Sequence, residues 1–301
     1  MAIPVVLDTD IGFDVDDVWA LVYLLKCPEI DLKLVTTSTG DTLYRASIVA
    51  KILELADRQD VPIGIGIPLD HTPATHADWL GDFDLHSFSG EVLRDGVGAI
   101  TDTILGSSEE VTLLSIGPLP NVAAALAREA DIVDNARFVG MHGSLRVGYL
   151  GADRPMREYN VKQHALAARA ALSARWEKTI TPLDTCGNTF LKDDRFAMVK
   201  ASADPLVKAV LANHDLWFEH IADWPGFDKI DAASQSSILY DCVAVHLVFD
   251  ESVFGIEELP VRVTEDGKTL IDEESGTLIR CATSWTDEEG FLDTLATRLV
   301  S

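Results

Sequence analysis

The densest group of residues that could carry chemistry lies near the start of the chain. Five aspartates fall within ten residues: Asp8, Asp10, Asp14, Asp16 and Asp17. Carboxylates this close repel one another, and burying them is costly unless a cation compensates their charge. Ligand sets made only of oxygen select hard cations such as Ca²⁺ or Mg²⁺. The spacing therefore predicts a metal site, and a solvated acidic loop is the alternative.

The flanking residues show which elements would position these aspartates. Residues 3–7 form an apolar run typical of a buried strand, and residues 16–25 predict a helix that opens on two acids, as helix N-termini favour. Gly12 allows a tight turn between the two elements. The aspartates are thus expected beyond the C-terminal end of a strand, where ligands bind in open parallel sheets.

Short apolar runs alternate with longer amphipathic ones along most of the chain. This alternation predicts an α/β fold of the Rossmann-like kind, with an open, mostly parallel sheet flanked by helices. Further strands are expected at 32–37, 61–65, 111–116, 136–141 and 179–183, and helices at 43–55, at 121–128 with Asn121 as its N-cap, at 164–175 and from near Asp241. Residues 261–263 and 269–271 flank Glu265-Asp266-Gly267, a hairpin signal. Without a linker or repeat, residues 1–301 are interpreted as one domain.

Composition narrows the class of protein. Of 301 residues 47% are hydrophobic, which suffices for a large core, and 24 basic against 49 acidic residues give a net charge of −25. Such a charge disfavours binding to nucleic acid and to anionic membranes. No apolar run approaches about 20 residues, and no signal peptide is recognisable, so a cytoplasmic protein without a membrane span is expected. Four scattered cysteines are expected to be free thiols: Cys27, Cys186, Cys242 and Cys281.

The aspartate cluster also belongs to a longer ordered pattern. The run V-V-L-D-T-D-I-G at 5–12 with D-D at 16–17 resembles the N-terminal signature of the inosine–uridine nucleoside hydrolase family, with two extra residues before the paired aspartates. Further elements of that family are matched in order by V-T-T-S-T-G-D at 35–41, H-A-D-W-L-G at 76–81, I-G-P-L-P-N at 116–121, M-H-G at 141–143, E-Y-N at 158–160 and Y-D-C-V-A at 240–244. One such motif is weak, but the ordered set spans roughly residues 3–250.

The resemblance implies a metal site and a reaction. Ca²⁺ would be held by Asp10, Asp17, Asp241 and the backbone carbonyl of Ile116. Asp10 would act as general base toward a water that attacks the anomeric carbon of a ribonucleoside or a related furanosyl N-glycoside. The expected partner is therefore a small-molecule nucleoside or furanosyl glycoside, in purine or pyrimidine salvage, and the expected assembly is a homodimer or homotetramer.

The resemblance also implies residues that contact substrate. Asp16, Glu158 and Asn160 would bind the sugar hydroxyls, Asp41 would add a hydrogen bond, and His76 would lie in a loop beside the substrate. Each has a structural alternative that the sequence leaves open. Glu158 and Asn160 are also typical loop polar residues, Asp241 a helix cap, and His76 a surface histidine.

Three positions depart from the family pattern. Tyr240 stands where some relatives have a histidine that protonates the leaving group, Ala152 falls where an asparagine meets the 5′-hydroxyl, and Asp41 replaces the asparagine of a G-N turn. Tyr240 is the candidate hydrogen-bond donor to the leaving group, although a phenol with a pKa near ~10 suits this task less well than histidine. The half of the site that binds the sugar and the metal is therefore expected to be intact. The sequence does not predict which nucleobase the substrate carries.

Two other functions remain as alternatives. A Mg²⁺-dependent phosphatase of the haloacid dehalogenase type also carries D-x-D after its first strand, but no downstream lysine and paired-acid loop match it. A non-catalytic protein that binds a sugar or nucleoside would explain Tyr240 and Ala152. Retention of Asp10 beside the other aspartates favours the hydrolase, because a binding protein needs no base.

Overall fold

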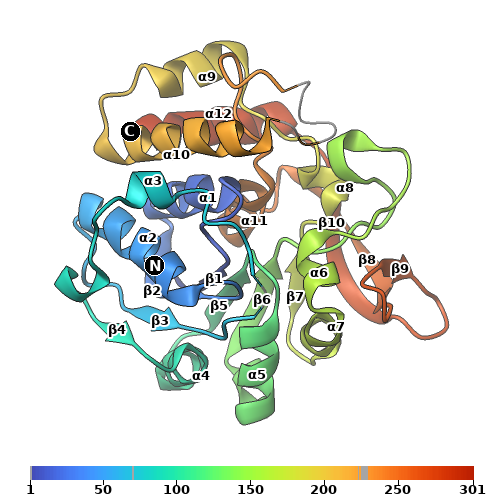
Figure 1. Ribbon diagram of the computed structural model, residues 1–301. Helices are drawn as coiled ribbons and strands as arrows, with labels where there is room; N and C mark the ends of the chain where they lie inside the picture. Colours follow the sequence, from blue (N-terminus) through green and yellow to red (C-terminus); the bar gives the residue numbers. More distant parts are fainter. Residues whose placement is uncertain (1, 70, 223, 225–229) are drawn as a thin grey trace.

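The computed structural model of the chain describes residues 2–69, 71–222, 224 and 230–301. Its described strands form one sheet in the order β4-β3-β2-β1-β5-β6-β7-β10-β8-β9 (Figure 1). All neighbouring strands from β4 through β7 to β10 in this order pair in parallel. Strand β8 pairs antiparallel with both β10 and β9. The strands are β1 (Ile3–Thr9), β2 (Ile30–Thr37), β3 (Ile63–Ile65), β4 (Val92–Leu93), β5 (Val111–Ser115), β6 (Ala136–Gly140), β7 (Lys178–Ile180), β8 (Phe254–Val263), β9 (Thr269–Ile271) and β10 (Thr277–Trp285).

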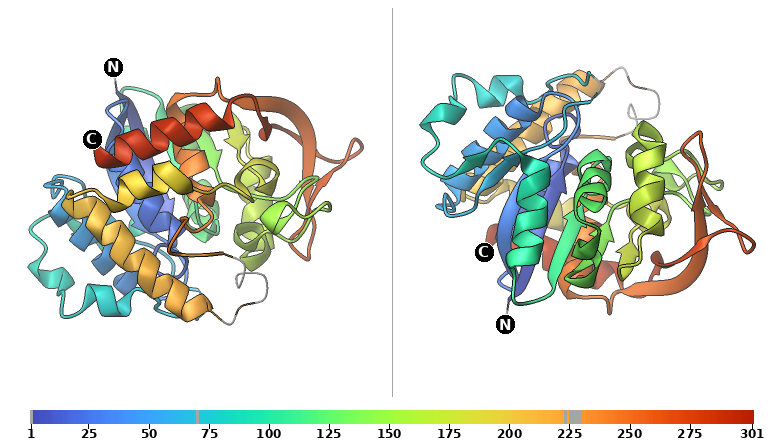
Figure 2. Two further views of the ribbon diagram at one scale, coloured as in Figure 1. Left: turned by 90° about the horizontal axis from the view of Figure 1, so that it is seen from above. Right: turned by 90° about the horizontal axis from the view of Figure 1, so that it is seen from below.

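Side chains of β1 alternate between two hydrophobic cores, as the period of two in a strand requires. Val5 and Leu7 belong to one core and Val6 to the other. Helices pack on both faces of the sheet, as Figures 1 and 2 show. The first core is covered by α1 (Asp16–Leu25), α2 (Thr42–Leu55) and α11 (Tyr240–Phe249), with α9 (Asp193–Lys200), α10 (Pro205–Ile221) and α12 (Glu288–Val300) outside them. The second is covered by α4 (Gly96–Gly106), α5 (Pro120–Arg128) and α7 (Ala165–Ser173).

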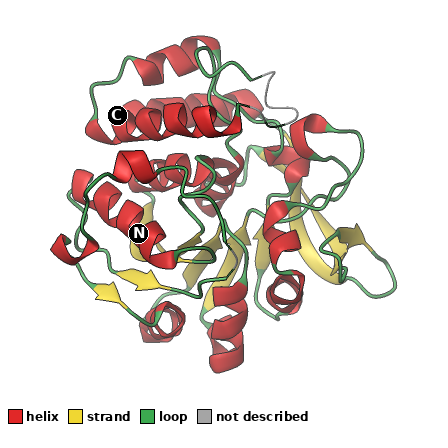
Figure 3. Cartoon of the chain, viewed as in Figure 1, coloured by secondary structure: helices red, strands yellow, loops and turns green. Residues whose placement is uncertain are grey.

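Short helices lie in the connections, which run around the sheet in Figure 3. They are α3 (Ala77–Leu80), α6 (Tyr159–Gln163), α8 (Leu183–Cys186) and three 3₁₀ turns, η1 (Leu85–Ser87), η2 (Ala130–Asp134) and η3 (Tyr149–Gly151). None of the described helices combines the length and apolar character that a bilayer crossing needs.

The mostly parallel α/β fold is confirmed, and so is the hairpin at 261–271, which is the β8–β9 pair. Two element bounds were wrong. The strand expected at 61–65 begins only at Ile63, and the one expected at 179–183 ends at Ile180 before α8. The helix expected at 164–175 is α7, Ala165–Ser173. Apolar residues in short connecting segments pack on the core without joining the sheet, so apolar runs overstate strand length.

Asn121 does not cap α5, which was the expectation. The helix begins at Pro120, and the buried Asn121 side chain instead donates to Asp8 Oδ1 (2.8 Å) and to the carbonyl of Thr37 (3.0 Å). Its Oδ1 accepts from the Ile67 amide at 2.8 Å. Asn121 therefore ties together the ends of β1, β2 and β3. All four cysteines are free and buried, as expected.

Candidate active site

A cavity of about 560 Å³ lies beyond the C-terminal ends of β1, β5 and β6. The sheet order brings these three strands side by side, so residues far apart in sequence meet there. Acidic and polar residues on its wall are Asp10, Asp14, Asp16, Asp17, Arg154, Glu158, Asn160 and Asp241. The aromatic and apolar residues that line the cavity are Phe13, Ile116, Met141, Tyr149, Leu150, Ala152, Met156, Tyr159, Trp224 and Tyr240.

Three carboxylates converge at the N-termini of two helices that pack together. Asp16 and Asp17 open α1, and Asp241 lies in the first turn of α11, so helix dipoles favour their negative charge. One carboxylate oxygen from each lies within 4.8 Å of the others, and all three residues are buried. We call Asp16, Asp17 and Asp241 the carboxylate trio. Thr9 Oγ1 donates to Asp17 and holds one of its oxygens in place.

The trio fits a divalent cation with oxygen ligands. Burial raises the pKa of Asp16, Asp17 and Asp241 well above the usual range, and the surrounding carboxylates raise it further. Arg45 lowers the pKa of Asp17, but the net shifts are upward, so the protein compensates the negative charge of the ionised trio only in part. Among the described residues, the ion pair between Asp10 and Arg45, at 3.9 Å, is the only one that an acid of this cavity makes. The trio is thus able to bind a metal, and its all-oxygen donor set suits a hard ion.

Asp10 lines the same cavity but lies outside the trio. It follows β1 directly and is 6% exposed. Gly117 stands against it: a Cβ on this glycine would come within 2.6 Å of Asp10 Oδ1, so only glycine allows this approach. Gly12, at φ +114°, makes the turn after Asp10, and a Cβ there would meet the ring of Tyr44 at 2.8 Å.

Glu158 and Asn160 line the cavity and also shape it. Glu158 is the N-cap of α6, and its two oxygens accept from the amides of Asn160 (2.6 Å), Val161 (3.1 Å) and Gly143 (3.0 Å). Burial raises its pKa to about 7. Asn160 Nδ2 donates to the carbonyl oxygen of Ile116 at 2.9 Å. Asn160 therefore orients the backbone carbonyl that the family resemblance names as a metal ligand.

The structure does not bring Asp41 and His76 to the cavity. Asp41 is exposed and caps α2, accepting from the amides of Leu43 (3.1 Å) and Tyr44 (3.0 Å). His76 is fully buried behind the aspartate loop, where its Nε2 lies 3.1 Å from the carbonyl oxygen of Asp14. Burial lowers the pKa of His76 to about 4, so the ring is neutral and donates this hydrogen bond. Both residues support the loop and the helix beside the site.

Aromatic side chains form the wall of the cavity around Tyr240. The ring of Tyr149 meets Tyr240 edge-on at 5.9 Å, and Phe13 contacts Tyr159 and Trp224 at 5.9 and 5.8 Å. Burial raises the pKa of Tyr240 well above its usual range, and Asp14 raises it further. Among the other aromatic residues, Trp217 packs in the hydrophobic core, and Trp79, Phe83 and Phe218 pack against that core.

Several contributors to the site were not predicted, among them Phe13, Tyr149 and Arg45. Phe13 and Asp14 lie between Gly12 and the paired aspartates, in the stretch that is two residues longer than in the family signature. Arg45 did leave a signal in the sequence. It shares a helix face with Ile48, Val49 and Ile52, so its side chain was readable as one that faces the core.

Comparison with known proteins supplies the family. The profile of a family described as "Inosine-uridine preferring nucleoside hydrolase" matches residues 5–293. The non-specific ribonucleoside hydrolase RihC of Klebsiella pneumoniae is 30% identical over 208 residues, 65% of this chain and 66% of the relative. The pyrimidine-specific ribonucleoside hydrolase RihA of an Enterobacter species is 28% identical over 99% of this chain and 98% of the relative.

A solved plant nucleoside hydrolase, PpNRh1, has the same fold. It superimposes with a TM-score of 0.84 over all of both chains at 21% identity. The match of the family profile covers the cavity from the aspartate cluster through Asp241. This chain therefore belongs to the inosine-uridine preferring nucleoside hydrolase family and is a hydrolase that acts on N-glycosyl compounds.

Proposed function

We propose that this protein hydrolyses the N-glycosidic bond of a ribonucleoside or related furanosyl N-glycoside with the help of Ca²⁺. The observation that carries the proposal is the buried carboxylate trio, whose ligand oxygens lie within 4.8 Å of one another in the wall of the cavity. Asp17 and Asp241 from the trio, Asp10 and the carbonyl of Ile116 would hold the ion. Bound there, Ca²⁺ would orient a water and make it more acidic.

The chain's own residues then divide the remaining tasks. Asp10 accepts the proton of the attacking water at its carboxylate, and Asp16 binds a sugar hydroxyl beside the ion. Glu158 and Asn160 form the cavity wall that faces the sugar on the side of β5 and β6. Asp41 and His76 do not line the cavity, so neither is a proposed substrate contact.

Tyr240 and the aromatic wall are assigned to the leaving group. The Tyr240 hydroxyl donates a hydrogen bond, but its raised pKa makes it a poor source of a full proton near neutral pH. Flat rings such as Phe13 and Tyr159 suit contact with a planar leaving group. We therefore propose that leaving groups which depart without protonation are favoured. A cytoplasmic location and a homodimer or homotetramer stay predictions.

A substrate panel tests the reaction class. Inosine, uridine, adenosine, cytidine and p-nitrophenyl riboside are incubated with the protein and Ca²⁺, and reducing sugar is measured. We expect stoichiometric release of sugar and leaving group, with p-nitrophenyl riboside at least tenfold faster than inosine in kcat/KM, because its leaving group needs no proton. Saturable binding without sugar release from any substrate would identify a binding protein. Phosphate release from p-nitrophenyl phosphate with Mg²⁺ would point to the phosphatase.

A further inference from the structure

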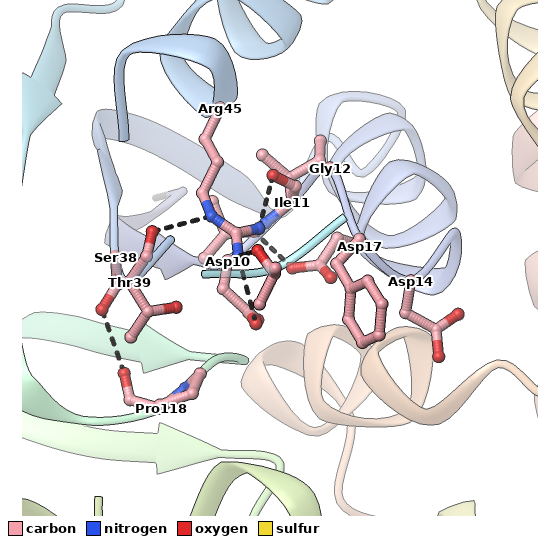
Figure 4. A network of polar contacts seen from close by, with 12 residues as sticks. Asp10, Ile11, Gly12, Asp14, Asp17, Ser38, Thr39, Arg45 and Pro118 are labelled. Carbon is pink, nitrogen blue, oxygen red and sulfur yellow. Dashed lines mark hydrogen bonds and ion pairs between the residues drawn. The ribbon is translucent and has the colours of Figure 1, made fainter. Parts of the chain in front are cut away.

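Arg45 is a buried cation directly behind the site. It lies in α2, is 1% exposed, and its guanidinium faces the loop that follows β1 (Figure 4). Nη1 donates to the carbonyl of Ile11 (2.8 Å), Nε to that of Thr39 (2.9 Å) and Nη2 to Thr72 Oγ1 (3.1 Å). These acceptors come from the segments after β1, β2 and β3, so the guanidinium is fixed in position and orientation. Thr39 holds a left-handed φ of +60°, a costly conformation for threonine that this hydrogen bond supports.

The two oxygens of Asp10 face different groups. Oδ2 lies 3.9 Å from Arg45 Nη2, and Oδ1 abuts Gly117, the residue after the Ile116 carbonyl. Arg45 also binds the carbonyl of Ile11, the residue that follows Asp10, so it controls both the backbone and the side chain of this position. The same arrangement leaves Asp10 outside the carboxylate trio, although Asp10 is near enough for its charge to raise the pKa of all three members.

We infer that Arg45 is a positioning residue that acts through Asp10. Its charge draws Oδ2 away from the trio, so that Asp10 presents one oxygen to the ion and water rather than closing on the ion with both. This inference rests on the proposed role of Asp10 as base. A second consequence does not depend on turnover. A buried positive charge beside the carboxylates opposes the binding of a cation, so Arg45 weakens Ca²⁺ binding while it supports catalysis.

These two effects have opposite signs, which separates positioning from general structural support. In Arg45→Met we expect kcat on p-nitrophenyl riboside to fall about 100-fold, as small misplacements of a reacting group do. In the same variant Ca²⁺ should bind about fivefold more tightly by calorimetry, because a repelling charge is gone. Arg45→Lys keeps the positive charge but loses the planar set of guanidinium donors. We therefore expect kcat to fall about tenfold, with Ca²⁺ affinity within about threefold of wild type.

Arg137→Met is the matched control. Arg137 also binds a backbone carbonyl, that of Val248 at 2.6 Å, but at the N-terminal end of β6, far along the strand from the site. It should lower thermal stability and leave kcat and Ca²⁺ affinity unchanged. If Arg45→Met fails to fold, Thr72→Val frees Nη2 alone and should lower kcat about threefold without weakening Ca²⁺ binding.

Two results would overturn the inference. Normal kcat in folded Arg45→Lys and Arg45→Met would show that the guanidinium only fills space. A fall in Ca²⁺ affinity parallel to kcat would show that Arg45 supports the ion site as a whole. Failure of the proposed function is distinguishable from both, since wild type would then release no sugar, while the Ca²⁺ titration still reports whether Arg45 repels the ion.

Discussion

Asp10→Asn is expected to lower kcat by about three orders of magnitude, within the range known for loss of a general base. The amide is nearly isosteric with the carboxylate and keeps an oxygen beside Gly117, but it cannot take a proton from water. Because Asp16, Glu158 and Asn160 still line the cavity, KM should change by less than about threefold, the mark of an interaction made in the transition state. Steady-state kinetics on p-nitrophenyl riboside at saturating Ca²⁺ measures both constants.

Asp8→Asn is the control for this variant. Asp8 is two residues away and also buried, and burial raises its pKa to about 7, but it does not line the cavity. Its Oδ1 accepts from Thr36 Oγ1 at 2.6 Å and from Asn121 Nδ2 at 2.8 Å, which an asparagine oxygen can also do. Turnover should stay within about threefold of wild type. Near-normal kcat in a folded Asp10→Asn protein would remove Asp10 from the role of base.

Asp241→Asn is expected to have a large effect on Ca²⁺ binding rather than on the chemical step. Deleting one charged ligand should weaken Ca²⁺ binding about 100-fold, because affinity follows ligand charge. Without Ca²⁺ the same change should stabilise the protein, since it removes a buried carboxylate that Asp16 and Asp17 repel. Calorimetric Ca²⁺ titration and thermal melts with and without Ca²⁺ measure the two effects. A variant that binds Ca²⁺ as wild type does would exclude Asp241 as a ligand.

The pH dependence of the metal-free melts follows from the same carboxylates. The trio has folded-state pKa values raised well above the ordinary aspartate value of 3.8, so the folded state binds more protons than the unfolded state between these values. Stability is then fully present below the unfolded pKa and is lost as pH rises toward the folded one. Three buried histidines with pKa values lowered to about 4, His76, His142 and His246, act in the opposite sense below 6.5. Asp8 and Glu158, whose pKa burial raises to about 7, act in the same sense as the trio, so melts from pH 6.5 to 8.5 should show falling Tm.

Much of the fold was predictable because strands and helices each leave a characteristic spacing of apolar residues in the local sequence. Alternating apolar runs gave the parallel strands β1, β2, β5 and β6 nearly at their true bounds, and the paired aspartates gave the start of α1 at Asp16. The strand β10 and the helices α4 and α12 were not predicted. Strand β10 carries Arg280, Thr283 and Ser284 among its apolar residues, so its pairing with β7 and β8 depends on tertiary contacts that no local pattern records.

The site was predictable where function depends on residue type, and not where it depends on side-chain direction. The family resemblance named Asp10, Asp17 and Asp241 as ligands, and all three line the cavity. Asp41 and His76 also follow family motifs, but a helix N-cap and a buried loop contact satisfy their polar atoms outside the cavity. Arg45 shows the converse. The proposed role of Arg45 depends on three chain segments whose acceptors meet at its guanidinium. Only the fold brings these segments together.

The most direct test of the account is a crystal structure grown with Ca²⁺ and a non-hydrolysable ribosyl analogue, with the ion identified by anomalous scattering. We expect one Ca²⁺ with oxygen ligands only, at about 2.3–2.6 Å, from Asp10, Asp17, Asp241 and the carbonyl of Ile116. The sugar should lie against Asp16 and Asn160, with one Asp10 oxygen facing a water below the anomeric carbon and the other facing Arg45. A structure with the analogue bound but no metal at these carboxylates, at a Ca²⁺ concentration that supports turnover, would contradict the account.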